Sequence, residues 1–156
     1  MKKVLLVCLL AIYAFSVAAQ DQNEENIKEI KEVIQNAYVD GLQNLGDIEV
    51  IEEGFHAGFN LLIFRDNLVS TLPIYNWIEY TKRRKEATPE GITEDKKVSV
   101  EFEFVDVTGT AAVAKIHLFQ GGHKIYTDYL SLYKFQEGWK IVSKIYFQIP
   151  PPPPGE

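Results

Sequence analysis

The sequence has few of the residues on which several kinds of functional site depend. It holds one cysteine and three histidines among 156 residues. Because Cys8 lies in the N-terminal apolar segment, the rest of the chain can form no disulfide, no cysteine-based metal site and no thiol nucleophile. The histidines form no helical pair at i and i+4 beside an acidic residue, so we expect no metal site.

Motifs for phosphate groups and nucleic acids are also absent. There is no glycine-rich phosphate loop, no G-x-S-x-G motif and no repeat of fixed period, and nothing indicates a bound cofactor. The net charge is −6, which repels phosphate backbones. The one basic run, residues 82–85, falls at the end of a predicted helix, where cations complement the helix dipole. We therefore expect no nucleic-acid partner.

Residues 1–19 have the layout of a signal peptide. Two lysines precede an apolar run over residues 4–17, and Ala18 and Ala19 follow it. The run is short for a membrane span, and small residues stand where a signal peptidase cleaves. We predict cleavage after Ala18 or Ala19, an exported protein that is periplasmic or extracellular, and no membrane association afterwards. An uncleaved N-terminal anchor is the alternative.

Helical patterns occupy the first half of the remaining chain. Apolar residues recur at spacings of three and four over residues 24–45, which predicts an amphipathic helix. A short helix over residues 48–53 follows, and Pro73 suits the first turn of a third helix that ends near residue 85. Between them, residues 61–65 and 68–72 predict a hairpin around an Asp66-Asn67 turn.

From residue 98 the apolar pattern changes to a period of two. Four strands are predicted, over residues 98–107, 111–120, 123–135 and 139–149. Helices followed by a meander of strands indicate an α+β domain over residues 20–149, with helices on one face of an antiparallel sheet. Residues 150–156 contain a run of prolines and are predicted to be a disordered proline-rich tail.

This order of elements resembles the NTF2-like superfamily. The stretches YVDGLQNLGDIEVIEEGFHAGF and YTDYLSLYKFQEGWKIVSKIYF are similar to its bacterial group of putative lumazine-binding proteins, over about residues 24–149. The resemblance implies a cone in which N-terminal helices pack on a strongly curved antiparallel sheet, with a ligand cavity between them and a homodimer formed through the sheet. It does not imply catalysis, because one fold serves many functions.

Aromatic residues suggest what such a cavity would bind. A flat conjugated molecule would stack between rings, and the residues we expect to line the cavity are Tyr38, His56, Phe59, Trp77, Tyr129 and Phe147. Trp77, on the third helix, is the expected lid. The alternative for these rings is ordinary core packing, because large apolar side chains fill interiors whatever the function.

Two residues are candidate bases. His56, between Phe55 and Phe59, could accept a proton from a ligand, or it could merely bond the backbone of its loop. The role of Asp128 depends on the strand register. A two-residue turn at Gly121-Gly122 predicts that Asp128 lies opposite Lys115.

The same register places His117 opposite Tyr126. Inside the cone, these residues could transfer protons and stabilise developing negative charge. On the outer face, they would form a solvated pair of little energetic value.

The last turn decides which face of the final strand is covered. A bulged turn with Gly138 predicts Tyr133 opposite Ile141 and Tyr129 opposite Ile145, on a strongly apolar face. The other face is expected to form the dimer interface and carries Asp128, Leu130, Leu132, Val142, Lys144 and Tyr146. A two-residue turn would reverse this assignment.

Three functions fit the sequence. The first is noncatalytic binding of a small aromatic or heterocyclic molecule in the cone. The second is an isomerase or dehydratase of the ketosteroid-isomerase kind with His56 or Asp128 as base, and the third is a dimeric interaction module whose cavity is filled. An enzyme needs at least two titratable groups converging in a closed apolar cavity, a binder needs the cavity with fewer such groups, and an interaction module needs neither.

Overall fold

The computed structural model describes residues 22–151. The predicted signal peptide and residues 152–156 of the predicted tail lie outside the described residues. None of the helices within residues 22–151 has the length and apolar content of a membrane span.

The described chain begins with a long helix whose second half is wide. Residues 22–33 are α-helical, and η1 (Ile34–Gln43) continues as a π-helix. Beyond it, the N–H of Gly46 reaches back to the carbonyls of Asp40 and Gly41, each at 2.9 Å. The limits agree with the predicted helix over residues 24–45, but the apolar spacing did not predict the π geometry. Such wide turns are uncommon and often occur at functional sites.

The short helix α2 (Ile48–Gly54) packs tightly against this helix. The side chain of Asp47 caps it by accepting the N–H of Glu49 at 3.0 Å. A Cβ at Gly54 would overlap that of Ala37, so only glycine permits this close approach. The two helical segments therefore form one support beneath the sheet.

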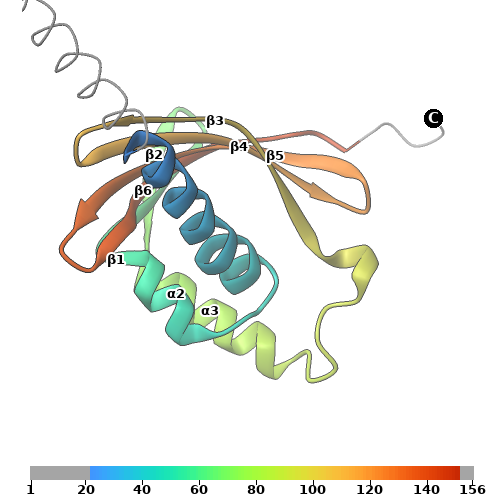
Figure 1. The fold of residues 1–156 in the computed structure, drawn as a ribbon. Helices are drawn as coiled ribbons and strands as arrows, with labels where there is room; N and C mark the ends of the chain where they lie inside the picture. Colours follow the sequence, from blue (N-terminus) through green and yellow to red (C-terminus); the bar gives the residue numbers. More distant parts are fainter. Residues whose placement is uncertain (1–21, 152–156) are drawn as a thin grey trace, which may run out of the picture.

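Six strands form a curved, unclosed sheet with the helices on one face (Figure 1). Strand order is β2-β1-β6-β5-β4-β3, and every neighbouring pair is antiparallel except β1 and β6. The remaining elements are β1 (Phe55–Arg65), β2 (Leu68–Pro73), α3 (Ile74–Glu86), the 3-10 turn η2 (Glu94–Lys96), β3 (Val98–Thr108), β4 (Ala111–Gln120), β5 (His123–Phe135) and β6 (Gly138–Gln148). The predicted α+β class is confirmed, and the parallel pair adds the first hairpin to the edge of the meander.

A bulge in β5 overturns the predicted register of the β4–β5 hairpin. Gly121-Gly122 forms the predicted two-residue turn, and Gln120 pairs with His123. Ile125 is then left without a partner, so every later pair shifts by one residue and Ile116, rather than Lys115, lies opposite Asp128. Because successive side chains alternate between faces, this shift sends Asp128 inward and Lys115 outward.

The β5–β6 hairpin contains a second shift. Its turn has two residues, so Tyr133 lies opposite Lys140 and not Ile141 as predicted. Val142 is left unpaired, after which Tyr129 lies opposite Ile145, as predicted. The helices cover the face that carries Leu130, Leu132 and Lys144, so the expected dimer interface is wrong and this face is the interior.

The core lies between this inner face and the helices. Its fully buried aliphatic side chains come from both layers: Ile30, Ile34, Val39, Leu42, Ile51, Ile116, Leu118, Leu130, Leu132 and Ile141. Their burial supplies the main driving force for packing the helices on the sheet.

Candidate functional site

Three polar side chains meet inside this apolar core, and we name them the polar triad. Tyr38 comes from η1, Asp128 from β5 and Lys144 from β6. The Tyr38 hydroxyl donates to Asp128 Oδ2 at 2.6 Å. Lys144 Nζ donates to the Tyr38 hydroxyl at 2.7 Å and lies 2.7 Å from Asp128 Oδ2. Asp128 is 0% exposed and Lys144 is 4% exposed, so the triad joins a helix to two strands away from water.

Burial changes the acid–base behaviour of the triad. It raises the pKa of Tyr38 well above the ordinary value, and the neighbouring Asp128 raises it further. Burial lowers the pKa of Lys144, although Asp128 acts against this change. Tyr38 therefore keeps its proton at pH values at which a solvated tyrosine ionises.

Aromatic rings surround the Lys144 ammonium group. Nζ lies 4.9 Å from the ring centres of both Tyr38 and Tyr146, 5.9 Å from that of Tyr126 and 6.0 Å from that of Trp77. A cation this close to ring faces gains cation–π stabilisation, most of all when it is desolvated. The rings thus replace part of the water that Lys144 loses on burial.

One oxygen of the triad has no partner. Asp128 Oδ1 is buried and accepts no hydrogen bond from any described residue. A buried polar atom without a partner costs free energy, and such atoms are uncommon in folded proteins. It is the one buried side-chain oxygen or nitrogen in residues 22–151 left in this state.

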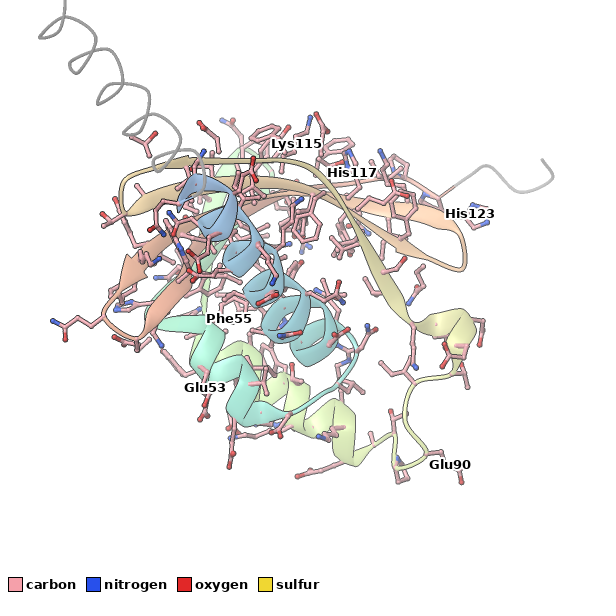
Figure 2. All side chains as sticks on the ribbon, viewed as in Figure 1. Glu53, Phe55, Glu90, Lys115, His117 and His123 are labelled. Carbon is pink, nitrogen blue, oxygen red and sulfur yellow. The ribbon has the colours of Figure 1, made fainter. Side chains whose placement is uncertain are left out.

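A cavity lies at the end of the sheet where β4 turns into β5. We name it the β4–β5 cavity; its volume is about 970 Å³. Its walls come from the loop after α3, η2, the β4–β5 turn and the end of β6, and include Leu45, Arg84, Lys96, Val98, His123, Lys124, Ile125, Tyr126, Gln148 and Pro150. Figure 2 shows His123 at the tip of the β4–β5 hairpin.

Tyr126 connects the cavity to the triad. It lines the cavity, and it precedes Asp128 by two residues on the inner face of β5, a separation of about 7 Å along a strand. Its ring packs edge-on against Tyr146 with centres 5.6 Å apart. Burial raises the pKa of Tyr126, with smaller contributions from Tyr146 and Asp128. The triad itself does not line the cavity.

Hydrogen bonds fix the walls of the cavity. Asn44 Nδ2 donates to the Val98 carbonyl, and the Val98 N–H donates to Asn44 Oδ1, both at 2.8 Å. Gln120 Nε2 donates to the Lys96 carbonyl at 2.6 Å. The end of the first helix and the η2 segment are therefore held to the sheet, which gives the cavity a defined shape.

Comparison with known proteins assigns the chain to a family. Residues 25–147 match the model of the family described as "Putative lumazine-binding". The chain belongs to this family. No curated protein matches it.

Solved structures similar to this Putative lumazine-binding family member are NTF2-like. One, an NTF2-like protein of unknown function from Shewanella baltica OS155, has a TM-score of 0.62 and 24% identity over 80% of this chain and 94% of that chain. Another, from Silicibacter pomeroyi DSS-3, has a TM-score of 0.65 and 16% identity over 81% and 98%. A third, from Novosphingobium aromaticivorans, has a cystatin-like fold, a TM-score of 0.63 and 18% identity over 85% and 88%. At these identities the likeness concerns the fold alone.

The structure brings three of the predicted ligand-binding residues of this family member together. The ring centres of Tyr38 and Trp77 lie 5.9 Å apart, and those of Phe59 and Trp77 lie 6.2 Å apart. Tyr38 and Phe59 are fully buried. The three rings pack against one another in the interior and do not line the β4–β5 cavity.

Two other predicted ligand-binding residues lie on the opposite face. Tyr129 is 44% exposed and Phe147 is 61% exposed, on the outer side of the sheet. The expectation that they line the interior was wrong, because the β5 bulge and the shift at Val142 set which side chains point inward. No residue at either bulge signals it directly, because Ile125 and Val142 are ordinary strand residues.

His56 lies in β1 and not in the predicted loop. Its Nδ1 accepts the Gly58 N–H at 3.0 Å, and its ring stacks on Phe135 with centres 4.9 Å apart and planes 10° apart. These contacts fit the backbone-bonding alternative, and His56 does not line the β4–β5 cavity.

The predicted cluster of Lys115, His117, Asp128 and Tyr126 is divided between the two faces. On the outer face, Lys115 Nζ and His117 Nε2 lie 2.8 and 2.9 Å from the oxygens of Glu103. Figure 2 shows Lys115 and His117 on the side of the sheet away from the helices. Asp128 is inside with Lys144, a partner that sequence reasoning missed. The available signal was a lysine on a strand face otherwise rich in buried apolar residues.

Metal ligands are not gathered at any point of the described chain. No group of three or more His, Cys, Asp or Glu side chains within residues 22–151 is placed to hold a metal ion.

Proposed function

We propose that this protein binds a small aromatic or heterocyclic molecule in the β4–β5 cavity without chemically changing it. The observation that carries the proposal is the cavity itself, because about 970 Å³ of space is lined by apolar and polar side chains together and has an aromatic side chain, Tyr126, in its wall. Ligand sites typically combine apolar walls with a few polar groups. The lumazine named in the family description is a flat heterocycle, which supports the same ligand class.

The filled interior supports this location. Tyr38, Phe59 and Trp77 occupy the space in which we expected the ligand, and the polar triad bonds mostly within itself. This filling is also what an interaction module would need. The β4–β5 cavity is the feature that favours a binding protein over that alternative.

The positions of the candidate bases support a noncatalytic role. Neither His56 nor Asp128 lines the β4–β5 cavity, and its lining includes no carboxylate. A base must come within hydrogen-bonding reach of the proton that it removes. In this arrangement neither candidate meets a molecule held in the cavity.

Binding can be tested by calorimetric titration with lumazine, riboflavin and a steroid. We expect Tyr126→Leu to weaken binding of the planar heterocycles by about tenfold, because stacking on an aromatic ring contributes on the order of 1 kcal/mol. Tyr133→Leu is the matched control, since it makes the same change on the outer face, where Tyr133 is 51% exposed. No heat and no melting shift with any compound would count against a binding protein.

Proton transfer is the second candidate function, and the unpaired Asp128 Oδ1 favours it. A buried carboxylate with one free oxygen, beside a tyrosine hydroxyl that could bond a carbonyl, has the parts of a ketosteroid-isomerase type of site. Such an enzyme would lose turnover but keep substrate binding in Asp128→Asn. An absence of turnover by the unmodified protein on a panel of β,γ-unsaturated ketones would remove this candidate.

A homodimer through the outer face of the sheet is part of the proposal. Large apolar side chains are exposed there: Phe104, Val113, Tyr129, Ile145 and Phe147. Four of them surround one hollow of about 270 Å³. Exposed apolar clusters of this kind typically mark protein contacts. The pairing face is therefore opposite to the one expected from sequence.

Export is proposed on the N-terminal sequence alone. Intact-mass analysis of the protein from its own host should give a chain that begins at Ala19 or Gln20. A mass that retains Met1 would instead indicate the uncleaved anchor.

A further inference from the structure

The charged residues around the β4–β5 cavity are of one sign. Its lining includes Arg84, Lys96 and Lys124, together with His123, and no aspartate or glutamate. The whole protein carries a net charge of −6. The cavity therefore departs from the average charge of the molecule. Glu90, in the loop beside it, is not part of the lining, and Figure 2 shows it at the outer edge of that loop.

A second cavity at the β5–β6 turn has the opposite character. It has a volume of about 550 Å³, and the glutamates that line it are Glu29, Glu32, Glu53 and Glu137. One cation, Lys134, lines it as well, and Lys134 is paired with Glu29 at 3.1 Å. Of these two cavities, the β4–β5 cavity is therefore lined by cations without carboxylates, and the β5–β6 cavity mainly by carboxylates.

The cations of the β4–β5 cavity are not engaged by carboxylates. Within residues 22–151, no salt bridge involves Arg84, Lys96 or Lys124. The Lys124 ammonium lies over the ring of Phe119, 6.0 Å from its centre, on the outer face of the sheet, so Arg84 and Lys96 are the cations available to the cavity. Lysines elsewhere on the sheet do pair, including Lys115, Lys134 and Lys140. Cations that face a cavity without an internal partner raise the local concentration of anions.

We propose that the β4–β5 cavity selects an anion, namely a flat ring system that carries a carboxylate or a phosphate group. The inference rests on the proposed binding function and adds the charge of the ligand to it. The ring would lie against Tyr126 and the apolar wall of Val98 and Ile125, and the anionic group would face Arg84 and Lys96. Charge-assisted hydrogen bonds from lysine and arginine to such oxygens are among the stronger ones in proteins.

The test uses four naphthalene compounds that share one ring system: 2-naphthoate, 2-naphthyl phosphate, 2-naphthamide and 2-(aminomethyl)naphthalene. Titration calorimetry on the purified protein should show at least one anion binding about tenfold more tightly than the neutral amide, with the ammonium compound weakest. Whichever anion binds more tightly identifies the preferred group. Raising the salt concentration should weaken the binding of both anions and leave the affinity for the amide unchanged.

Variants locate the preference in the cavity. Arg84→Gln and Lys96→Gln should each weaken anion binding by about threefold to tenfold and leave amide binding unchanged. Arg83→Gln is the matched control, because it removes the same charge from the adjacent position of α3 but from a residue outside the lining. Circular dichroism of each variant checks that it is folded.

The outcomes separate the two proposals. Equal affinity for the amide and both anions would overturn the charge preference and leave the binding function intact. Equal losses in Arg83→Gln and Arg84→Gln would also overturn it, because the effect would then come from the general charge of the protein. An absence of binding by all four compounds would overturn both.

Discussion

The two faces of the sheet hold similar charge pairs in different surroundings. On the inner face, Lys144 lies 2.7 Å from Asp128, and their side chains are 5% and 0% exposed. On the outer face, Lys115 lies 2.8 Å from Glu103, and their side chains are 22% and 41% exposed. Distance barely distinguishes the pairs. The difference teaches that burial, and not proximity, decides how much the protein loses when one partner is removed.

Desolvation explains why the pairs differ. An ion taken out of water loses several kcal/mol of hydration, on the order of the attraction it gains from a well-placed partner. Asp128 and Lys144 have both lost that hydration, and Tyr38 and the surrounding rings replace part of it. Glu103 keeps its water and is screened by it, so its pair with Lys115 adds little stability.

Removing the inner lysine should give the largest effect. Lys144→Met keeps most of the side-chain volume but leaves Asp128 buried without a cation, and we expect the free energy of unfolding to fall by about 3–5 kcal/mol. Lys115→Met, the same change on the outer face, should cost at most about 1 kcal/mol. Urea denaturation measures both values.

A double substitution sharpens this comparison. Replacing Asp128 and Lys144 together by leucine and methionine removes both charges, and it should restore much of the stability lost in Lys144→Met. Equal losses in Lys144→Met and Lys115→Met would contradict the claim that burial separates the pairs.

Tyr38→Phe should have the next largest effect. It removes the hydrogen bond that the Tyr38 hydroxyl donates to Asp128 and the one that it accepts from Lys144, but it leaves Lys144 and Asp128 in contact, so we expect a loss of about 1.5–3 kcal/mol at neutral pH. Urea titration of this variant beside the unmodified protein provides the measurement.

The effect of Tyr38→Phe should also depend on pH. The pKa of Tyr38 is raised above its ordinary value of 10.0, so above about pH 10 the unfolded chain loses a proton that the folded protein keeps. The stability contributed by Tyr38 is then full below pH 10 and falls as the pH rises further. The difference in free energy of unfolding between the unmodified protein and Tyr38→Phe should therefore become smaller above pH 10. A constant difference from pH 7 to 11 would contradict a raised pKa of Tyr38.

Charge on the outer face should break the proposed dimer without unfolding the chain. Ile145 is 51% exposed, so Ile145→Glu places a carboxylate in the pairing face, and we expect dimerisation to weaken by at least about tenfold. Phe64→Glu is the control, because Phe64 is 71% exposed but lies on β1, outside the cluster. Sedimentation velocity that shows a monomer for the unmodified protein at all concentrations would remove the dimer proposal.

His56→Ala should have the smallest effect. The ring stacks on Phe135 and accepts one backbone N–H, contacts worth about 1 kcal/mol or less, and it does not line the β4–β5 cavity. Melting temperature and affinity for 2-naphthoate are the two measurements. A large loss of affinity for 2-naphthoate with an unchanged melting temperature would contradict this expectation and indicate that His56 contacts the ligand.

Much of the fold could be predicted from local patterns. Asp66 and Asn67 have φ angles of 52° and 62°, as the two-residue turn required, and the strands from residue 98 onwards begin and end close to their predicted limits. The spacing of apolar residues and the residue types at the turns are local features, and they are enough to predict where these elements begin and end. The order of helices and strands along the chain likewise predicts the α+β class.

The site could not be predicted to the same degree. Single unpaired residues at Ile125 and Val142 decide which face of β5 and β6 is buried, and nothing in their own chemistry distinguishes them from ordinary strand residues. Tyr38 was identified as an interior residue. Its partner Lys144 was not, because a lysine on a strand is usually exposed, and only the tertiary structure supplies the buried carboxylate that it meets.

Hydrogen exchange with and without 2-naphthoate tests most directly where the molecule binds. If the packed interior is closed and the β4–β5 cavity is the binding site, protection should rise in the segments that line that cavity: residues 43–45, 91–98, 120–126 and 148–149. The amides around the β5–β6 cavity, residues 134–139, should be unchanged. Protection confined to residues 134–139, or none in a protein that binds the compound, would contradict the account.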